Sequence, residues 1–86
     1  MHFVYVIKSV LDHNLYIGYT RNPKKRMGEH NRKENFSTKS RTPWKLIFIE
    51  GYLEEKDARR REKYLKTNQG SRLLKRMLKE YFFKQK

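Results

Sequence analysis

Five side chains in this sequence are of types that could carry out acid–base chemistry on an anionic substrate. They are Tyr5, Tyr16, Arg26, His30 and Glu62. A phenol or an imidazole can exchange protons, a guanidinium binds phosphate through two parallel hydrogen bonds, and a lone carboxylate can bind a divalent cation. Each residue also has an ordinary structural interpretation, so the spacing must decide between the two.

The two tyrosines lie in neighbouring segments that alternate as strands do. Tyr5 and Tyr16 would occupy adjacent strands of one hairpin, with a parity that lets both rings share one face of a sheet. The alternative is that both are half-buried sheet aromatics, which is common for tyrosines in strands.

Arg26 and His30 are four residues apart in a predicted helix, so they project from the same face. The arginine could bind a phosphate, and the histidine could order a nucleophilic water or a tyrosine hydroxyl. The competing interpretation is a solvated basic helix, because Lys24, Lys25 and Arg26 form a run of charge.

Glu62 is a carboxylate among cationic neighbours. It lies four residues after Ala58 and three before Leu65, so it borders the inward face of its predicted helix. Two interpretations stay open: an ion pair with Lys66 four residues on, or an oxygen ligand for a divalent ion.

Several well-known catalytic motifs do not occur in the sequence. There is no Walker glycine loop, no HExxH, no GxSxG and no cysteine, and the three histidines lack the spacing of metal ligands. The five side chains named above are therefore the best candidates for chemistry.

Two strands and a helix are predicted in the first half of the chain. His2–Ser9 is apolar on both faces and reads as a central strand, and Asn14–Thr20 should pair with it as an antiparallel hairpin. Asn22 can cap a helix that has Pro23 at its first position and runs to about Asn31. Residues 31–43 read as a mobile polar loop.

The second half predicts a strand and two helices. Trp44–Tyr52 is the third strand, and a helix follows from about Glu54 to Lys66, with Gly70 as a C-cap residue and Ser71 capping the next helix. The apolar residues expected to pack into the core from these helices are Ala58, Tyr64, Leu65, Leu74, Met77, Leu78 and Tyr81. The predicted fold is α+β, with a three-stranded antiparallel sheet flanked by helices in the order β-β-α-β-α-α.

The composition indicates a protein that binds polyanions. There are 22 Lys and Arg against 9 Asp and Glu, a net charge of +13, and residues 56–86 hold 12 of the basic and 3 of the acidic side chains. Similar charge is routine in proteins that coat RNA or bind ribosomes. Eighty-six residues without cysteine or a long apolar run favour one domain, residues 1–86, in a soluble cytoplasmic protein that does not contact a membrane.

In order and spacing, the motifs resemble the GIY-YIG nuclease superfamily, especially its short stand-alone bacterial members. The resemblance spans nearly the whole chain, and its motifs are Tyr5, Tyr16-Ile17-Gly18, Arg26 with His30, Thr38, Pro43-Trp44-Lys45-Leu46, Ala58, the run Arg61-Glu62-Lys63-Tyr64-Leu65-Lys66, and Gly70. One departure is that the first motif reads Phe3-Val4-Tyr5, so the family's leading glycine is replaced by Phe3, which we expect to pack in the core.

The resemblance implies a role for each candidate residue. Tyr5 would be the general base, and Tyr16 a supporting hydroxyl near the scissile phosphate. Arg26 would neutralise developing charge, and His30 would orient Tyr5 or the nucleophile. Glu62 would be the single protein ligand of one Mg²⁺ or Mn²⁺ that steadies the leaving oxygen. We also expect the cation, Arg26 and the basic background to lower the pKa of Tyr5, so that activity rises toward alkaline pH.

The predicted function is a metal-dependent endonuclease that nicks DNA with one active site per monomer. The alternative is a non-catalytic nucleic-acid-binding protein that retains the fold. RNA is an open alternative to DNA, the oligomeric state is open, and no small-molecule cofactor is expected. The basic residues expected to contact nucleic acid are Lys25, Lys39, Arg41, Arg59, Lys66 and Arg72.

Overall fold

A computed structural model describes residues 1–84 of the chain. Three strands, β1 (His2–Ser9), β2 (Leu15–Thr20) and β3 (Trp44–Tyr52), form one antiparallel sheet in the order β2-β1-β3. The predicted sheet, with the first strand in the centre, is confirmed. The helices are α1 (Pro23–Asn31), the short 3-10 helix η1 (Lys39–Arg41), α2 (Glu55–Leu65), α3 (Asn68–Met77) and α4 (Lys79–Lys84).

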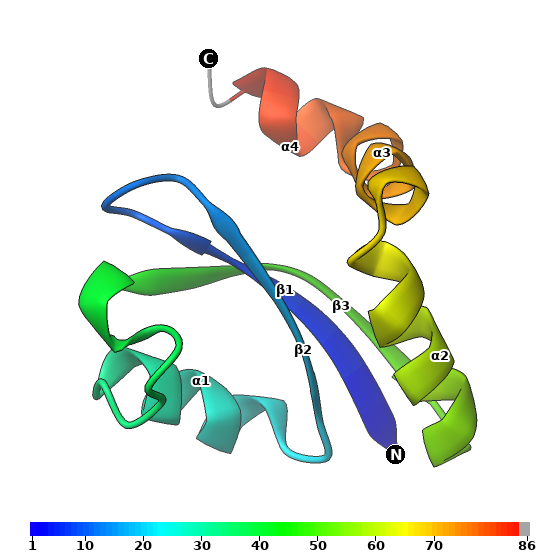
Figure 1. Ribbon diagram of the computed structural model, residues 1–86, viewed down its shortest axis with the longest axis horizontal. Coiled ribbons are helices and arrows are strands. Elements are labelled where there is room, and N and C mark those ends of the chain that lie inside the picture. Colours follow the sequence, from blue (N-terminus) through cyan, green and yellow to red (C-terminus); the bar gives the residue numbers. More distant parts are fainter. Residues whose placement is uncertain (85–86) are drawn as a thin grey trace.

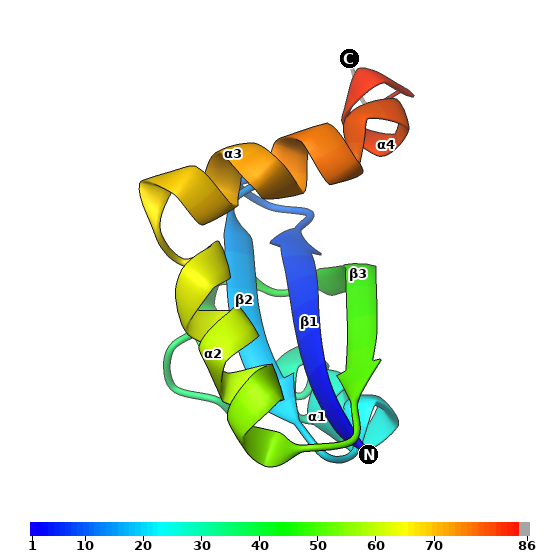
Figure 2. The same cartoon turned by 90° about the vertical axis from the view of Figure 1, so that its right-hand side faces the viewer.

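The helices cover both faces of the sheet. Figure 1 shows α1 on one side of the strands and α2 with α3 on the other. In the view of Figure 2, α2 runs alongside β2, and α3 crosses beyond the ends of the strands. None of the helices among residues 1–84 has the length and apolar content needed to span a bilayer.

Each face of the sheet has its own core. Val4 and Val6 of β1 are fully buried on the α2 side against Ala58, Leu65 and Leu74. Successive side chains of a strand point to opposite faces of the sheet, so the other residues of β1 face α1. There, on the α1 side, the buried side chains are Tyr5, Ile7 and Trp44, with Tyr16 and Met27 packed against them. The second core is therefore built largely from aromatic rings that carry polar groups.

Helix α1 begins as the sequence predicts. The side chain of Asn22 accepts a hydrogen bond from the backbone N–H of Lys25 at 3.1 Å, and Pro23 occupies the first helical position. At the other end, the side chain of Asn31 accepts from the backbone N–H of Trp44 at 2.7 Å and donates to the Trp44 carbonyl at 3.2 Å. These bonds fasten the end of α1 to the start of β3.

The region between α2 and α3 differs from the prediction. Gly70 does not cap α2: it is buried inside α3, where an added Cβ would come 1.9 Å from the carbonyl oxygen of Tyr64. The N-cap of α3 is Thr67, not Ser71, and its hydroxyl accepts from the N–H of Gly70 at 3.0 Å. Gly70 is thus required for the close approach of α3 to the end of α2.

Two residues expected in the core are exposed. Tyr64 is 38% exposed and Met77 is 42% exposed, because Leu65 and Leu74 are the side chains that α2 and α3 turn inward. The last predicted helix is also divided, since α3 ends at Met77 and α4 begins at Lys79.

Candidate active site

Tyr5 and Tyr16 share one face of the hairpin, as predicted. Tyr5 pairs with Gly18 across the two strands, and Tyr16 lies two residues before that glycine, on the same face. The ring of Tyr5 lies over Gly18, where an added Cβ would be 2.4 Å from the phenol oxygen. Because Gly18 has no side chain, the Tyr5 hydroxyl can reach across β2, which is an edge strand.

The replaced glycine of the first motif does not obstruct this arrangement. Phe3 lies beside Gly51 of β3, where an added Cβ would be 3.2 Å from the Phe3 ring. The ring thus leans toward β3, whereas Tyr5 leans toward β2.

His30 connects Tyr5 to the loop after α1. Its Nε2 lies 2.9 Å from the Tyr5 hydroxyl and its Nδ1 lies 2.7 Å from the hydroxyl of Thr38. The Thr38 hydroxyl in turn donates to the carbonyl of Asn35 at 3.5 Å. The Thr38 oxygen can then accept a hydrogen bond from Nδ1–H, which leaves Nε2 to accept the hydrogen bond of the Tyr5 phenol.

Thr38 is a site residue whose role the sequence did not reveal. We expected residues 31–43 to form a mobile loop, yet Thr38 is fully buried, and its carbonyl accepts from the indole N–H of Trp44 at 3.0 Å. The loop also contains η1. The family resemblance includes Thr38 but assigns it no role, and a threonine in a polar segment does not by itself predict such a contact, because burial depends on how the loop folds back onto α1.

The remaining candidate residues surround Tyr5 and His30. The rings of Tyr16 and His30 meet edge to face with 5.3 Å between centroids. Arg26 lies close enough to influence the pKa of both Tyr5 and His30, and its guanidinium is 3.6 Å from the carboxylate of Glu29. Glu29 is a second contributor that sequence reasoning missed.

Glu62 reaches the same region from α2. Its side chain is 15% exposed, and its charge acts on the Tyr5 phenol. One turn earlier, the guanidinium of Arg59 is 3.7 Å from the centre of the Tyr19 ring on β2, which places this face of α2 along β2. Glu62 is also ion-paired, with Lys66 at 3.0 Å and with Arg59 at 3.8 Å.

The electrostatics of Tyr5 differ from our expectation. Burial raises the pKa of the Tyr5 phenol, and the neighbouring Tyr16 raises it further, whereas Arg26 lowers it only in part. The prediction of a lowered pKa is therefore wrong for the chain itself. Burial, followed by Arg26, lowers the pKa of His30, so the imidazole is held in its neutral form.

The residues predicted to contact nucleic acid are spread over several parts of the surface, and Arg59 of α2 lies against the Tyr19 ring. Lys25 and Arg26 line a hollow of about 180 Å³ at one end of β2, and Lys66 lines one of about 340 Å³ with Tyr16 at the other end. Arg72 is exposed on α3. The loop residues Lys39 and Arg41 instead lie over aromatic rings, those of Phe36 and Trp44.

Comparison with known proteins identifies the class of this fold and site. A family model described as the GIY-YIG catalytic domain matches residues 1–81, so the chain belongs to the GIY-YIG catalytic domain family, which has a nuclease fold. It is 38% identical over 80 residues to a UPF0213 protein of Staphylococcus aureus, covering 92% of this chain and 95% of that relative. It is 39% identical over 67 residues to a UPF0213 protein of Staphylococcus haemolyticus, covering 77% of this chain and 80% of that relative. No solved structure matches.

Proposed function

We propose that this protein is an endonuclease that nicks DNA by hydrolysing a phosphodiester bond at the cluster of Tyr5, Tyr16, Arg26, His30 and Glu62. The observation that carries the proposal is the buried hydrogen bond of 2.9 Å between Tyr5 and His30, with a guanidinium and a carboxylate within electrostatic reach. A phenol hydrogen-bonded to an imidazole, with a positive and a negative side chain nearby, is typical of a site for acid–base chemistry on a phosphate ester.

The proton path follows from the two pKa shifts. Because burial keeps the Tyr5 phenol protonated, it needs an acceptor for its own proton when it takes one from the attacking water. Neutral His30 is that acceptor, and Nε2 receives the Tyr5 proton while the Tyr5 oxygen receives the water proton. Thr38 holds the imidazole in the required tautomer. As the water oxygen bonds to phosphorus, the bond from phosphorus to the leaving sugar oxygen breaks, and that oxygen takes a proton from solvent while His30 releases its own. Arg26 stabilises the negative charge that develops on the phosphate oxygens.

Glu62 fits the single protein ligand of a divalent cation. Among the residues that the structure describes, no three His, Cys, Asp or Glu side chains gather as a metal site, so a cation here would keep most of its waters, as Mg²⁺ prefers. When bound, Mg²⁺ or Mn²⁺ would supply Lewis-acid stabilisation of phosphate charge. Glu62 must then exchange its ion pair with Lys66 for the cation.

The substrate strand would follow the β2 edge. The two hollows lie at the ends of β2, and the four residue steps from Tyr16 to Thr20 span about 13 Å of strand. Basic residues line both hollows, so phosphates on either side of the cleaved bond would meet a positive charge.

A plasmid assay tests the proposal. Supercoiled plasmid incubated with the protein and Mg²⁺ or Mn²⁺ should be nicked, and the nicking should stop with EDTA and in Glu62→Ala and Tyr5→Phe. Nicking that survives Glu62→Ala would refute the proposed metal ligand. The ion pair between Glu62 and Lys66 supports a second candidate, a non-catalytic nucleic-acid binder. Tight DNA binding without cleavage of any substrate would favour it.

A further inference from the structure

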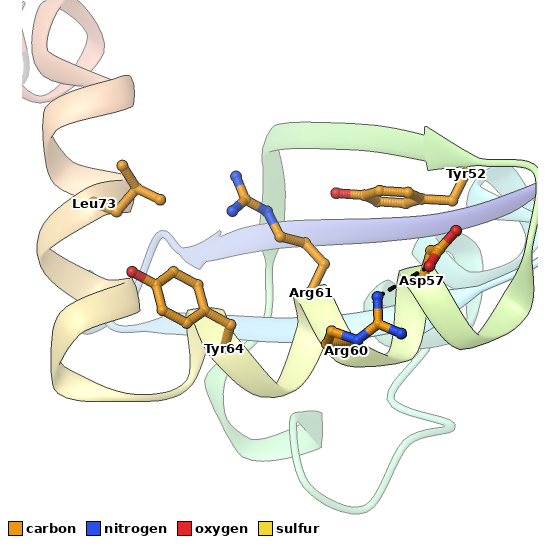
Figure 3. A pocket seen from close by; sticks show the side chains of 6 residues that line it. All are labelled: Tyr52, Asp57, Arg60, Arg61, Tyr64 and Leu73. Carbon is orange, nitrogen blue, oxygen red and sulfur yellow. Dashed lines mark hydrogen bonds and ion pairs between the residues drawn. The ribbon is translucent and has the colours of Figure 1, made fainter.

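Another hollow lies on the side of α2 that faces away from the candidate active site. It has a volume of about 570 Å³, within the usual range of small-molecule sites. Tyr64 follows Glu62 by two residues, about 200° round the helix, so the two side chains point to opposite sides of α2. The lining residues, drawn in Figure 3, are Tyr52, Asp57, Arg60, Arg61, Tyr64 and Leu73.

The back of this hollow is held in place by Glu50. Its carboxylate accepts from the Tyr52 hydroxyl at 2.6 Å and from Nε of Arg61 at 2.7 Å. Burial and this carboxylate raise the pKa of Tyr52 to about 12, so its hydroxyl remains a donor. The planar guanidinium of Arg61 is therefore fixed in position between the rings of Tyr52 and Tyr64, as Figure 3 shows.

The front of the hollow is open and apolar, with charge at its rim. Tyr64 is 38% exposed, so one face of its ring is open to a ligand. Arg60 is 74% exposed, and its only ion pair among residues 1–84 is with Asp57 at 3.0 Å. Helix α3, which supplies Leu73, has three basic residues and no acidic one.

We propose that this hollow binds an unpaired nucleotide of a single-stranded DNA segment, with its base stacked on Tyr64 and Arg61 and its phosphate at Arg60. Aromatic rings and guanidinium planes accept any base by stacking, and a basic rim attracts the backbone. The inference deepens the proposed function, on which it rests, because it assigns to the nuclease a substrate with an unpaired strand beside the cleaved one.

The test measures binding without cleavage. The full chain is titrated in EDTA with a fluorescent 12-nucleotide oligothymidine and with a 12-base-pair duplex. Tyr64→Ala should weaken oligothymidine binding about tenfold, the cost of one stacked base, and duplex binding less than twofold. Tyr64→Phe retains the ring and should bind as the wild type does. Equal effects of Tyr64→Ala on both ligands, or no effect, would overturn the proposal.

Arg60→Gln provides a second test on an exposed residue whose change leaves the core intact. Its matched control is Arg32→Gln on the far side of the molecule, because Arg32 is also exposed and also paired with an acidic residue, Glu34. The salt dependence of oligothymidine binding should fall by about 0.7 in log–log slope for Arg60→Gln only. Equal slopes in both variants contradict a phosphate contact. Since no cleavage is involved, an inactive protein that shows these effects would refute the nuclease and retain the site.

Discussion

His30 owes its position to two hydroxyl groups, one on each side of the imidazole. Tyr5 lies at Nε2 and Thr38 at Nδ1, and all three side chains are buried. At the scale of single residues, the site therefore depends on hydrogen bonds that a buried imidazole cannot replace with water.

Thr38→Val tests the less obvious of these bonds. Valine has the shape of threonine without the hydroxyl, so Nδ1–H of His30 loses its acceptor and the protein should lose about 1–3 kcal/mol of stability. Urea unfolding measures the change. Thr42→Val is the matched control, because the Thr42 hydroxyl makes only an exposed hydrogen bond of 3.4 Å, and it should change stability by less than about 0.5 kcal/mol. Equal losses in the two variants would contradict the role of Thr38.

The lowered pKa of His30 predicts a loss of stability in acid. Above about pH 6.5 the imidazole is neutral in both the folded and the unfolded chain, so its contribution is fully present. As the pH falls below that value the unfolded chain takes up a proton first, and the stability falls until the folded state also titrates.

Thermal melts at pH 7.5 and pH 5 measure this effect. The drop in Tm should be smaller in His30→Gln than in the wild type, and unchanged in His13→Gln, whose histidine is exposed. An unaltered drop in His30→Gln would show that other groups account for the acid sensitivity.

The ion pair between Glu62 and Lys66 should compete with a metal ion. Lys66 is 53% exposed, and an exposed ion pair contributes about 0.2–1 kcal/mol, so Lys66→Gln should bind Mn²⁺ up to about fivefold more tightly. Calorimetric titration without DNA measures the affinity. Lys63→Gln, an exposed position on the same helix, removes the same charge and should leave the affinity nearly unchanged. Weaker Mn²⁺ binding by Lys66→Gln would contradict competition at Glu62.

At the scale of elements, the site depends on Gly18 of β2, which leaves room for the Tyr5 ring to reach His30. The hairpin pairing and the capped start of α1 could both be predicted, because alternation and capping are local patterns. The junction of α2 and α3 could not. A glycine near a helix end predicts a C-cap, and only the packing of α3 on Tyr64 distinguishes Gly70 as a residue of close approach.

Gly18→Ala tests whether the Tyr5 ring needs the space above Gly18. The new methyl group would lie 2.4 Å from the Tyr5 oxygen, so the ring must move and its hydrogen bond to His30 is lost. Plasmid nicking should fall by at least about tenfold, since a displacement of this size disrupts positioned proton transfer. Gly28→Ala is the control. Its methyl group meets only the flexible end of Arg32, and alanine stabilises a helix by about 0.5–1 kcal/mol relative to glycine. Full activity in Gly18→Ala would contradict this explanation of the glycine.

At the scale of the whole molecule, α1 on one face of the sheet and α2 on the other bring their site residues to a common edge. Arg26 and His30 come from α1, Glu62 from α2, and the tyrosines from the hairpin between them. The sequence could indicate these five residues through their spacing and family resemblance. The sequence could not indicate the hollow at Tyr64, because the spacing of Tyr64 in its helix equally predicts a core residue. Whether the Tyr64 ring is exposed depends on where Leu65 and Leu74 pack.

The central claim is that residues from these separate elements act as one catalytic unit. The most direct measurement is the rate of plasmid nicking with Mg²⁺ for Tyr5→Phe, Glu62→Gln and the double variant. Each single change should slow nicking by about 10²–10⁴-fold, and the double variant should be no slower than the slower single variant, because residues of one unit fail together. Wild-type rates in Glu62→Gln, or a double variant slowed by the product of the two factors, would contradict the claim.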